Sequence, residues 1–215
     1  MKLFDLLYSV LFCIRYLPFR TAIYVPILIS YKVKVGKLKR GQIVILSKPK
    51  RYMITIGYKG YSLIDSLNSL LYISNEGKLI LNGNCVFAQG CRIWIEKGAV
   101  MEIGNNFYCN RNCIFRAGDN IKIGNNVLMG WDIEMNTSDG HHLIIDNKKL
   151  NNHGDIVIGD NVWIASHCTF GKGSVVGNNS VIAQRSLVNK SFTLSNVLLG
   201  GIPAKVLKEN VRWKL

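Results

Sequence analysis

Two adjacent histidines, His141 and His142, follow Asp139 in the stretch TSDGHHLII (137–145). A neutral imidazole, with an ordinary pKa of about 6.5, can take a proton from an attacking hydroxyl at cellular pH. Such a base needs a partner on its other ring nitrogen, and Asp139, Glu134 or a backbone carbonyl could supply it. No serine or cysteine lies in a nucleophile-elbow context, so the stretch favours general-base chemistry without a covalent intermediate on the protein.

A six-residue repeat surrounds these histidines. From Ile158 the chain reads IGDNVW, IASHCT, FGKGSV, VGNNSV and IAQRSL, and IGNNFY, IGNNVL and MGWDIE obey the same rule earlier. Such a unit is too short for a helix but suits a short strand and a corner where Gly and Asn take positive φ. Three units make a coil of about 18 residues, so Ile158 is expected to stack on Val176, about 4.8 Å away.

The repeat breaks after Met135 and resumes at Ile156 or Ile158. This leaves a polar stretch of about twenty residues, and a long excursion from an economical coil is more often functional than accidental. We therefore predict a site in a loop at about 136–156.

The basic residues gather near the N-terminus. Residues 1–60 hold twelve Lys and Arg against the single acid Asp5, which gives +11 of the net charge of +14. The first twenty residues lack a signal-peptide cleavage site, and two arginines interrupt their apolar run, which is too short to span a bilayer. We predict an amphipathic helix over about 2–16, ending before Pro18. It either caps the open strand edge of the first coil or lies on an anionic membrane surface.

The six cysteines form no CxxC pair, and five of them keep the period of the inward apolar residues. We expect reduced cysteines, used as small core residues, in a cytoplasmic protein.

The repeat, followed by GGIPAKVLKEN near the C-terminus, resembles the hexapeptide-repeat acyltransferases over about residues 75–210. Within them it is most similar to the galactoside, xenobiotic and cell-surface polysaccharide O-acetyltransferases. The resemblance implies an all-β, left-handed parallel β-helix that acts as a homotrimer with acetyl-CoA. We expect an N-terminal amphipathic helical segment (1–30), the β-helix (31–200, its coils imperfect before about residue 75) and a C-terminal tail (201–215) with a short helix opened by Pro203.

The same resemblance assigns roles around the loop. A motif like DGHxI makes His141 the general base, with Asp139 beside it and His142 a weaker candidate for a substrate contact. FYCNRN (107–112) resembles the segment FYxNxN, whose asparagine contacts the acceptor sugar; here this is Asn110, with Tyr108 nearby. An asparagine placed only to form a coil corner is the structural alternative.

Coenzyme-binding residues are carried over in the same way. NVWIAS resembles the NVWIGS coil whose tryptophan borders the acetyl and pantetheine channel, although alanine here replaces the usual glycine. The phosphates of the coenzyme would meet three lysines, two of them three residues apart on the predicted tail helix. The expected coenzyme contacts are Trp163, Ala165, Ser166, Ala183, Lys190, Lys205 and Lys208. An outward packing role for the tryptophan and solvated lysines are the alternatives.

No metal is expected, because the gaps between His141 or His142, His153 and His167 do not match the spacing of the β-helical carbonic anhydrases. The leading hypothesis is direct acetyl transfer from acetyl-CoA to a sugar hydroxyl of a cell-surface glycan (capsule or lipopolysaccharide) or its precursor. N-acetylation of an amino sugar-nucleotide, and a non-catalytic scaffold that binds membrane or polyanion, are the alternatives. We expect a cytoplasmic protein with peripheral contact at the inner face of the plasma membrane, and no nucleic-acid partner.

Overall fold

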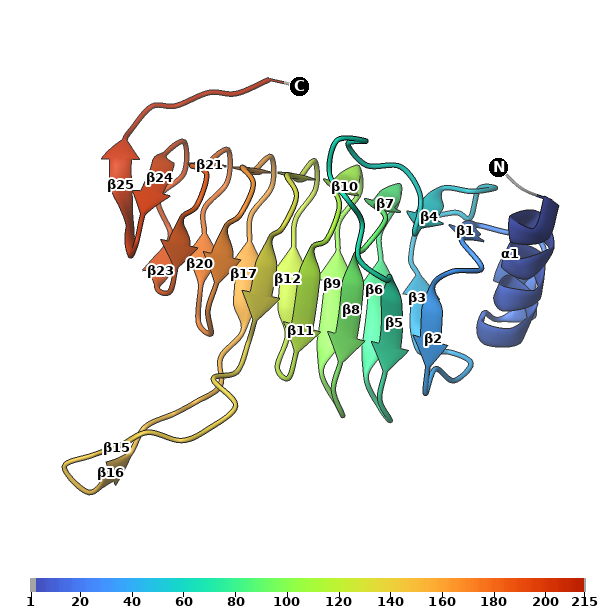
Figure 1. The fold of residues 1–215 in the computed structure, drawn as a ribbon, viewed down its shortest axis with the longest axis horizontal. Helices are drawn as coiled ribbons and strands as arrows, with labels where there is room; N and C mark the ends of the chain where they lie inside the picture. Colours follow the sequence, from blue (N-terminus) through green and yellow to red (C-terminus); the bar gives the residue numbers. More distant parts are fainter. Residues whose placement is uncertain (1–2, 215) are drawn as a thin grey trace.

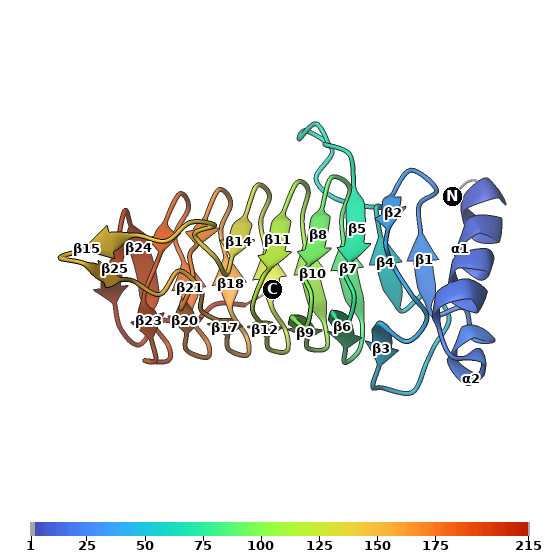
Figure 2. The same ribbon diagram turned by 90° about the horizontal axis from the view of Figure 1, so that it is seen from below.

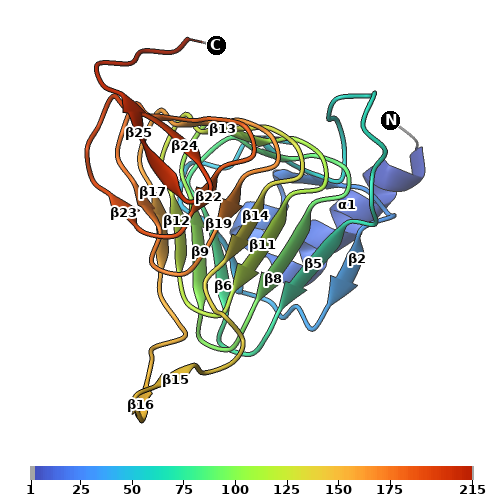
Figure 3. The ribbon, with the colours of Figure 1, turned by 60° about the vertical axis from the view of Figure 1, so that its left-hand side comes forward.

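The computed structural model describes residues 3–214, which wind into coils that stack along one long axis (Figure 1). Each complete coil contributes one strand to each of three sheets, so the sheets form the three faces of a prism, seen obliquely in Figure 3. The predicted stacking is confirmed, since Ile158 pairs with Val176 of the next coil.

The three faces are called sheets A, B and C. Sheet A contains β1 (Ile27–Ile29), β4 (Ile54–Ile56), β7 (Cys85–Phe87), β10 (Phe107–Cys109), β13 (Leu128–Met129), β18 (Trp163–Ile164), β21 (Val181–Ile182), β24 (Leu198–Gly201) and β25 (Ala204–Lys208). Sheet B contains β2 (Lys34–Gly36), β5 (Leu70–Ile73), β8 (Arg92–Ile95), β11 (Ile114–Ala117), β14 (Glu134–Asn136), β19 (Thr169–Phe170) and β22 (Leu187–Val188). Sheet C contains β3 (Ile43–Ile45), β6 (Lys78–Leu81), β9 (Val100–Ile103), β12 (Ile121–Ile123), β17 (Ile156–Ile158), β20 (Val175–Val176) and β23 (Ser191–Phe192).

The core fills the inside of the prism with alternate strand residues. Phe87, Phe107 and Phe115 pack ring against ring in its middle. All six cysteines are free and buried, in agreement with the prediction that they serve as small core residues. The sulfurs of Cys91 and Cys109 lie 3.4 Å apart, with the Cys113 sulfur close by.

The corners use the residues that the repeat predicts. Asn106, Asn126, Asn161 and Asn179 occupy equivalent corners with positive φ. Asparagine tolerates this left-handed conformation better than other side chains, so the repeated asparagines fix where each coil turns.

The β-helix begins earlier than residue 31. Ile27 of β1 already pairs with Ile54 of β4, so the first strand lies inside the segment assigned to the N-terminal helix. Two helices precede it, α1 (Leu3–Tyr16) and α2 (Phe19–Ala22), and both lie across the end of the prism (Figure 2). The early coils pair regularly, but residues 57–69 leave the coil between β4 and β5 in an excursion that the sequence did not predict.

The C-terminal tail corrects one prediction. Residues 204–208 form β25, antiparallel to β24, and not the short helix expected after Pro203. Gly201 has a φ of +104°, which lets the chain reverse into a tight hairpin. The open edge of sheet A would otherwise expose unpaired backbone groups, and pairing with β25 satisfies them.

Candidate active site

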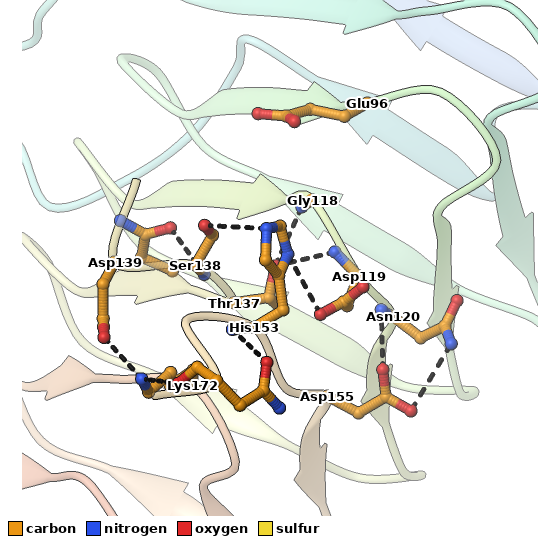
Figure 4. Close-up of polar contacts among 12 residues, drawn as sticks. Glu96, Gly118, Asp119, Asn120, Thr137, Ser138, Asp139, His153, Asp155 and Lys172 are labelled. Atoms are coloured by element: carbon orange, nitrogen blue, oxygen red, sulfur yellow. Dashed lines mark hydrogen bonds and ion pairs between the residues drawn. The ribbon is translucent and has the colours of Figure 1, made fainter. Parts of the chain in front are cut away.

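The predicted loop leaves the coil at the edge between sheets B and C, after β14, and returns at β17. Its first residues are held firmly (Figure 4). The buried Thr137 hydroxyl accepts hydrogen bonds from the backbone N–H groups of Gly118 (2.8 Å) and Asp119 (2.9 Å). On the returning side the Asp155 carboxylate accepts a 2.9 Å bond from the Asn120 N–H. The base of the loop is therefore tied to the preceding coil on both sides.

Beyond this base the loop extends away from the body as a hairpin of β15 (Ile144–Ile145) and β16 (Lys148–Lys149) (Figure 1). Every residue from 141 to 150 is exposed, including four large apolar ones. These apolar residues are Leu143, Ile144, Ile145 and Leu150. A two-stranded hairpin is marginal in water by itself, and exposed apolar side chains at its tip are typical of a surface that docks on another protein.

His141 and His142 lie at the start of this exposed segment. Among the described residues, neither ring makes a hydrogen bond or an ion pair. Asp139 does not orient His141, because its carboxylate lies 2.5 Å from the Lys172 Nζ and its N–H donates to the Asn152 carbonyl. Within one chain the candidate base thus has no group that fixes its tautomer.

A different histidine is held at the loop base. His153 Nδ1 lies 3.3 Å from an Asp119 carboxylate oxygen, and its Nε2 lies 3.5 Å from the buried Ser138 hydroxyl. Ser138 and His153 also form a β-bridge between the two arms of the loop. No sequence motif marks this cluster; its only sequence signal is that Asp119, Ser138 and His153 are polar residues beside the interruption.

The predicted acceptor residue lies on another edge of the prism, between sheets A and B. The Asn110 side-chain oxygen accepts hydrogen bonds from the N–H groups of Tyr61 (2.8 Å) and Arg111 (2.9 Å). Tyr61 belongs to the excursion at 57–69, and its ring stacks on Trp131 with centroids 5.7 Å apart. Asn110 therefore fastens this second loop with its oxygen, while its amide nitrogen makes no hydrogen bond within the described residues.

Tyr108 and Trp163 share the outer face of sheet A. Both pair with Leu128, one from each side, so they lie two strands apart, about 10 Å. Burial raises the pKa of the Tyr108 phenol. Trp213 from the C-terminal tail approaches Trp163, with ring centroids 6.3 Å apart, a contact that the sequence did not predict.

The remaining coenzyme candidates extend this face toward the C-terminal end. The register runs from Trp163 through Val181 and Leu198 to Lys208. Lys205 pairs with Gly200, and Lys208 pairs with Leu198. Leu199, between Gly200 and Leu198, is buried and faces inward, so its two neighbours face outward. Both lysines therefore lie on the outer face of sheet A. The two lysines thus share this face on a bulged strand, and not a face of the short helix that was predicted.

The small corner residues and Lys190 occupy the two edges of sheet B. Ala165, Ser166 and Ala183 lie at the edge between sheets A and B, where the Ser166 hydroxyl accepts a 3.3 Å bond from the Trp131 N–H. Lys190 lies at the other edge, between sheets B and C, with its Nζ 5.2 Å from the Phe192 ring centroid. The structure therefore does not bring all predicted coenzyme residues together within one chain.

The candidate residues fall into two groups separated by sheet B. His141, His142 and Asp139 are on the loop at the edge between sheets B and C. Tyr108, Asn110 and the small corner residues lie on sheet A or at its edge with sheet B. A single copy of the chain brings no histidine of the loop near the predicted acceptor asparagine.

Comparison with known proteins gives the family. A family described as bacterial transferase hexapeptide (six repeats) matches residues 155–190. A 24.8 kDa protein from the cps region of Klebsiella pneumoniae, of uncharacterized function, is 30% identical over 200 residues, which cover 93% of this chain and 86% of that protein. The chain belongs to the hexapeptide-repeat transferase family. Within this family, galactoside O-acetyltransferase of Escherichia coli K12 is 34% identical over 119 residues, which cover 54% of this chain and 58% of that enzyme.

Solved structures of the family share the fold. The polysialic-acid-specific acetyltransferase NeuO matches 88% of this chain and 89% of its own with a TM-score of 0.62 at 21% identity. A hexapeptide-repeat acetyltransferase of Vibrio cholerae, solved with acetyl-CoA, matches 63% of this chain and 71% of its own with a TM-score of 0.52 at 25% identity. This family member is accordingly an acyltransferase, and its relatives include O-acetyltransferases.

Proposed function

We propose that the chain is an acetyl-CoA-dependent O-acetyltransferase that modifies a sugar hydroxyl of a cell-surface glycan, such as capsule or lipopolysaccharide, or its precursor. The observation that carries the proposal is the anchored loop at 137–155, which presents His141 on the outside of a hexapeptide-repeat β-helix. The likeness to galactoside O-acetyltransferase supports a sugar acceptor, and the likeness to the Klebsiella cps-region protein supports a surface polysaccharide. The free, buried cysteines fit a reducing, cytoplasmic compartment.

The outer face of sheet A fits the coenzyme. Trp163 offers an apolar wall, Ala165 and Ala183 have small side chains at the neighbouring corner, and Lys205 and Lys208 supply positive charge further along the same face. When bound, acetyl-CoA supplies the acetyl thioester. His141 takes the proton from the acceptor hydroxyl as its oxygen attacks, and the Asn110 amide nitrogen donates a hydrogen bond that positions the sugar.

The two groups of residues meet when a second copy of the chain is added. If sheet B faces a rotation axis parallel to the stack of coils, the loop edge of one copy approaches the Asn110 edge of the next. Three copies of a triangular prism close such a ring, and we propose a homotrimer with the left-handed winding of the family. The loop tip, with its exposed apolar side chains, then packs on the neighbouring copy, and that neighbour supplies the missing partner of His141.

The outer face of sheet B supports this assembly. Tyr72 and Trp94 stack there with centroids 3.9 Å apart, and Trp94 is 39% exposed. Leu70 and Ile114 lie in the neighbouring row of the same face, one on each side of Arg92, and an ion pair of Arg116 with Glu96 (3.2 Å) lies beside the aromatic pair. Aromatic residues with arginine are enriched in protein interfaces, so this face suits burial against its own copies.

The experiment that tests the activity is a thiol-release assay with acetyl-CoA against galactosides, amino sugar-nucleotides and oligosaccharides from surface glycans. The proposal expects free coenzyme A in step with an O-acetylated sugar, whose ester is removed by mild base. An amide product that resists mild base would assign the chain to N-acetylation. If no acceptor in the panel causes release of coenzyme A, sugar O-acetylation by this chain is contradicted. Release that is equally fast without any acceptor would contradict it as well.

A further inference from the structure

The N-terminal helix α1 caps the β-helix with its more polar side. Its inward residues are Asp5, Ser9, Phe12 and Cys13. The Ile29 N–H donates a 3.0 Å hydrogen bond to the Ser9 hydroxyl, and the Asp5 carboxylate accepts a 3.1 Å bond from a neighbouring N–H. These polar side chains satisfy backbone groups beside the open edge of the first coil, which explains why they face inward.

The apolar side of α1 consequently faces outward. The five residues that the sequence places on one broad apolar face are all exposed, with exposed fractions of 51–75%: Leu3, Phe4, Leu7, Leu11 and Ile14. The short helix α2 adds Phe19, and Ile23 follows directly after this helix; both side chains are also exposed. We call these seven residues the end face, because α1 and α2 lie across one end of the prism (Figures 1 and 2).

Basic residues surround the end face. Arg15 and Arg20 are exposed on the helices, and Lys32, Lys39 and Arg40 follow on the first coil. The guanidinium of Arg40 donates to the last carbonyls of α1, those of Ile14 and Arg15, and so fixes the position of the helix. The only acid among residues 1–60, Asp5, is buried, so no exposed carboxylate from this part of the chain offsets this charge.

We propose that the end face lies on an anionic lipid surface, with α1 in the plane of the headgroups. An apolar helical face bordered by lysine and arginine is the arrangement that binds such surfaces, because the apolar side chains enter the acyl boundary while the cations meet the headgroups. A helix of 14 residues is only about 21 Å long, and no helix among the described residues is long and apolar enough to cross a bilayer. The helix therefore lies on the membrane.

Charge decides between lipid and a second copy of the chain as the occupant. Two end faces stacked head to head would bring the same cations of both copies together, which disfavours association. An anionic leaflet instead attracts every one of them. In the proposed homotrimer the three end faces point the same way, so one flat membrane engages them together and each strengthens the binding of the others. This joint binding rests on the proposed function, whereas the end face of one chain does not.

The membrane would be met by one end of the molecule only. The end face lies at the N-terminal end of the stack, whereas the loop hairpin and β25 lie toward the opposite end (Figure 1). The β-helix would stand on the leaflet with the coenzyme face at its side. An acceptor attached to a lipid would then reach the site from below, whereas a small free acceptor would not need the membrane at all.

The test is co-sedimentation of the full chain with vesicles of phosphatidylcholine alone or of phosphatidylcholine mixed with the anionic lipid phosphatidylglycerol. We expect sedimentation with the anionic vesicles at low salt, and loss of most binding at high salt because the charges are exposed. The double variant Leu7→Glu/Leu11→Glu should lose at least about tenfold in vesicle affinity, because two charges replace apolar side chains on the membrane side. The matched control is Leu63→Glu/Leu67→Glu, the same double change on two exposed leucines of the excursion at 57–69.

A second pair of variants separates charge from apolar contact. Arg15→Glu/Lys32→Glu should weaken binding to anionic vesicles strongly, whereas Lys97→Glu/Lys122→Glu, the same change on exposed lysines of the middle coils, should weaken it less. Equal losses in both pairs would mean that net charge alone drives binding, and would overturn the end face as the contact.

A probe locates the contact directly. All six natural cysteines are buried, so Leu7→Cys creates a single reactive thiol for a polarity-sensitive fluorophore. The emission should shift to the blue with anionic vesicles, and a fluorophore at Leu63→Cys should not shift. The proposal is overturned if the intact protein stays in the supernatant with anionic vesicles at low salt. It is also overturned if the fluorophore at Leu7→Cys shifts to the blue when the protein self-associates without lipid. The Leu7→Glu/Leu11→Glu variant should still acetylate a water-soluble sugar. If the proposed function is wrong, the unmutated chain will show no acetyl transfer, and this result is distinct from a failure to bind vesicles.

Discussion

The Nζ of Lys172 lies 2.5 Å from a carboxylate oxygen of Asp139, and this ion pair joins the loop to the coil that follows it. Lys172 also donates to the Asn151 carbonyl on the returning arm of the loop. One lysine thus holds both arms together just below His141. Asp139, which the family resemblance places beside the base, acts in this chain as an anchor of the loop.

Lys172→Gln is expected to lower acetyl transfer by about two- to fivefold at low salt and to leave coenzyme A affinity unchanged. The pair is partly exposed, so its loss costs about 1 kcal/mol or less. The unmutated enzyme should approach the rate of the variant at high salt, where the pair is screened. Lys97→Gln, on an exposed corner, is the control. A large loss of coenzyme A affinity in Lys172→Gln would show that this lysine binds the coenzyme instead.

His141→Ala is expected to lower turnover by about two to four orders of magnitude, the range for loss of a general base, with little change in acetyl-CoA affinity. His142→Ala, the adjacent and equally exposed residue, is the matched control and should lose far less. His153→Gln tests the rival histidine at the loop base, whose contacts with Asp119 and Ser138 suggest an anchoring role. A collapse of turnover confined to His153→Gln would move the base to that cluster.

The sequence predicts the coils well because their signal is local. Each inward position repeats after six residues, and the pairing of Ile158 with Val176 follows from counting alone. The bounds of the loop follow from where the count fails. By contrast, the partner of Asp139 is Lys172, in the next coil, and no local pattern links the two.

Two features depend on unpaired backbone groups that a sequence pattern does not display, and a third depends on a contact between distant side chains. The residues of β25 have fair helix propensity, but the open edge of sheet A offers hydrogen bonds that a helix would leave unmade. The amphipathic pattern of α1 predicts a helix, but not that Ser9 would turn inward to bond Ile29. The excursion at 57–69 lacks any repeat, and its contact of Tyr61 with Trp131 joins distant parts of the chain.

Lys205→Ala and Lys208→Ala are expected to weaken coenzyme A binding by several-fold each, and acceptor binding much less. Both lysines are exposed, so the loss should shrink as salt rises. The unmutated protein should bind dephospho-coenzyme A more weakly than coenzyme A, and the two variants should narrow that difference. Equal affinities for the two coenzymes in the unmutated protein would argue against a phosphate role for these lysines.

The buried thiols predict a loss of stability at alkaline pH. Burial raises the pKa of Cys85 from 9.0 to about 12, and that of Cys13 to about 11. Above pH 9 the unfolded thiols ionise while the folded ones keep their protons, so their contribution is complete below pH 9 and is lost as the pH rises toward 12. Urea unfolding should therefore show stability falling between pH 9 and 10.5, and less steeply in Cys85→Ala. An identical slope in that variant would contradict this origin.

Subunit mixing tests whether the site is shared between copies. His141→Ala removes the base, and Asn110→Asp keeps an oxygen for the Tyr61 and Arg111 N–H groups but removes the amide donor, so each variant alone should be nearly inactive. If the proposed homotrimer forms, co-expression in equal amounts should give mixed trimers in which each site takes its base from one copy and its asparagine from the next. Both must be intact, each with a chance of one half, so activity should recover to about a quarter of the unmutated level. If each site is built within one chain, co-expression will recover no activity, because every copy lacks one of the two groups. As a control, a mixture of the two purified, preassembled variants should stay inactive until the trimers exchange subunits.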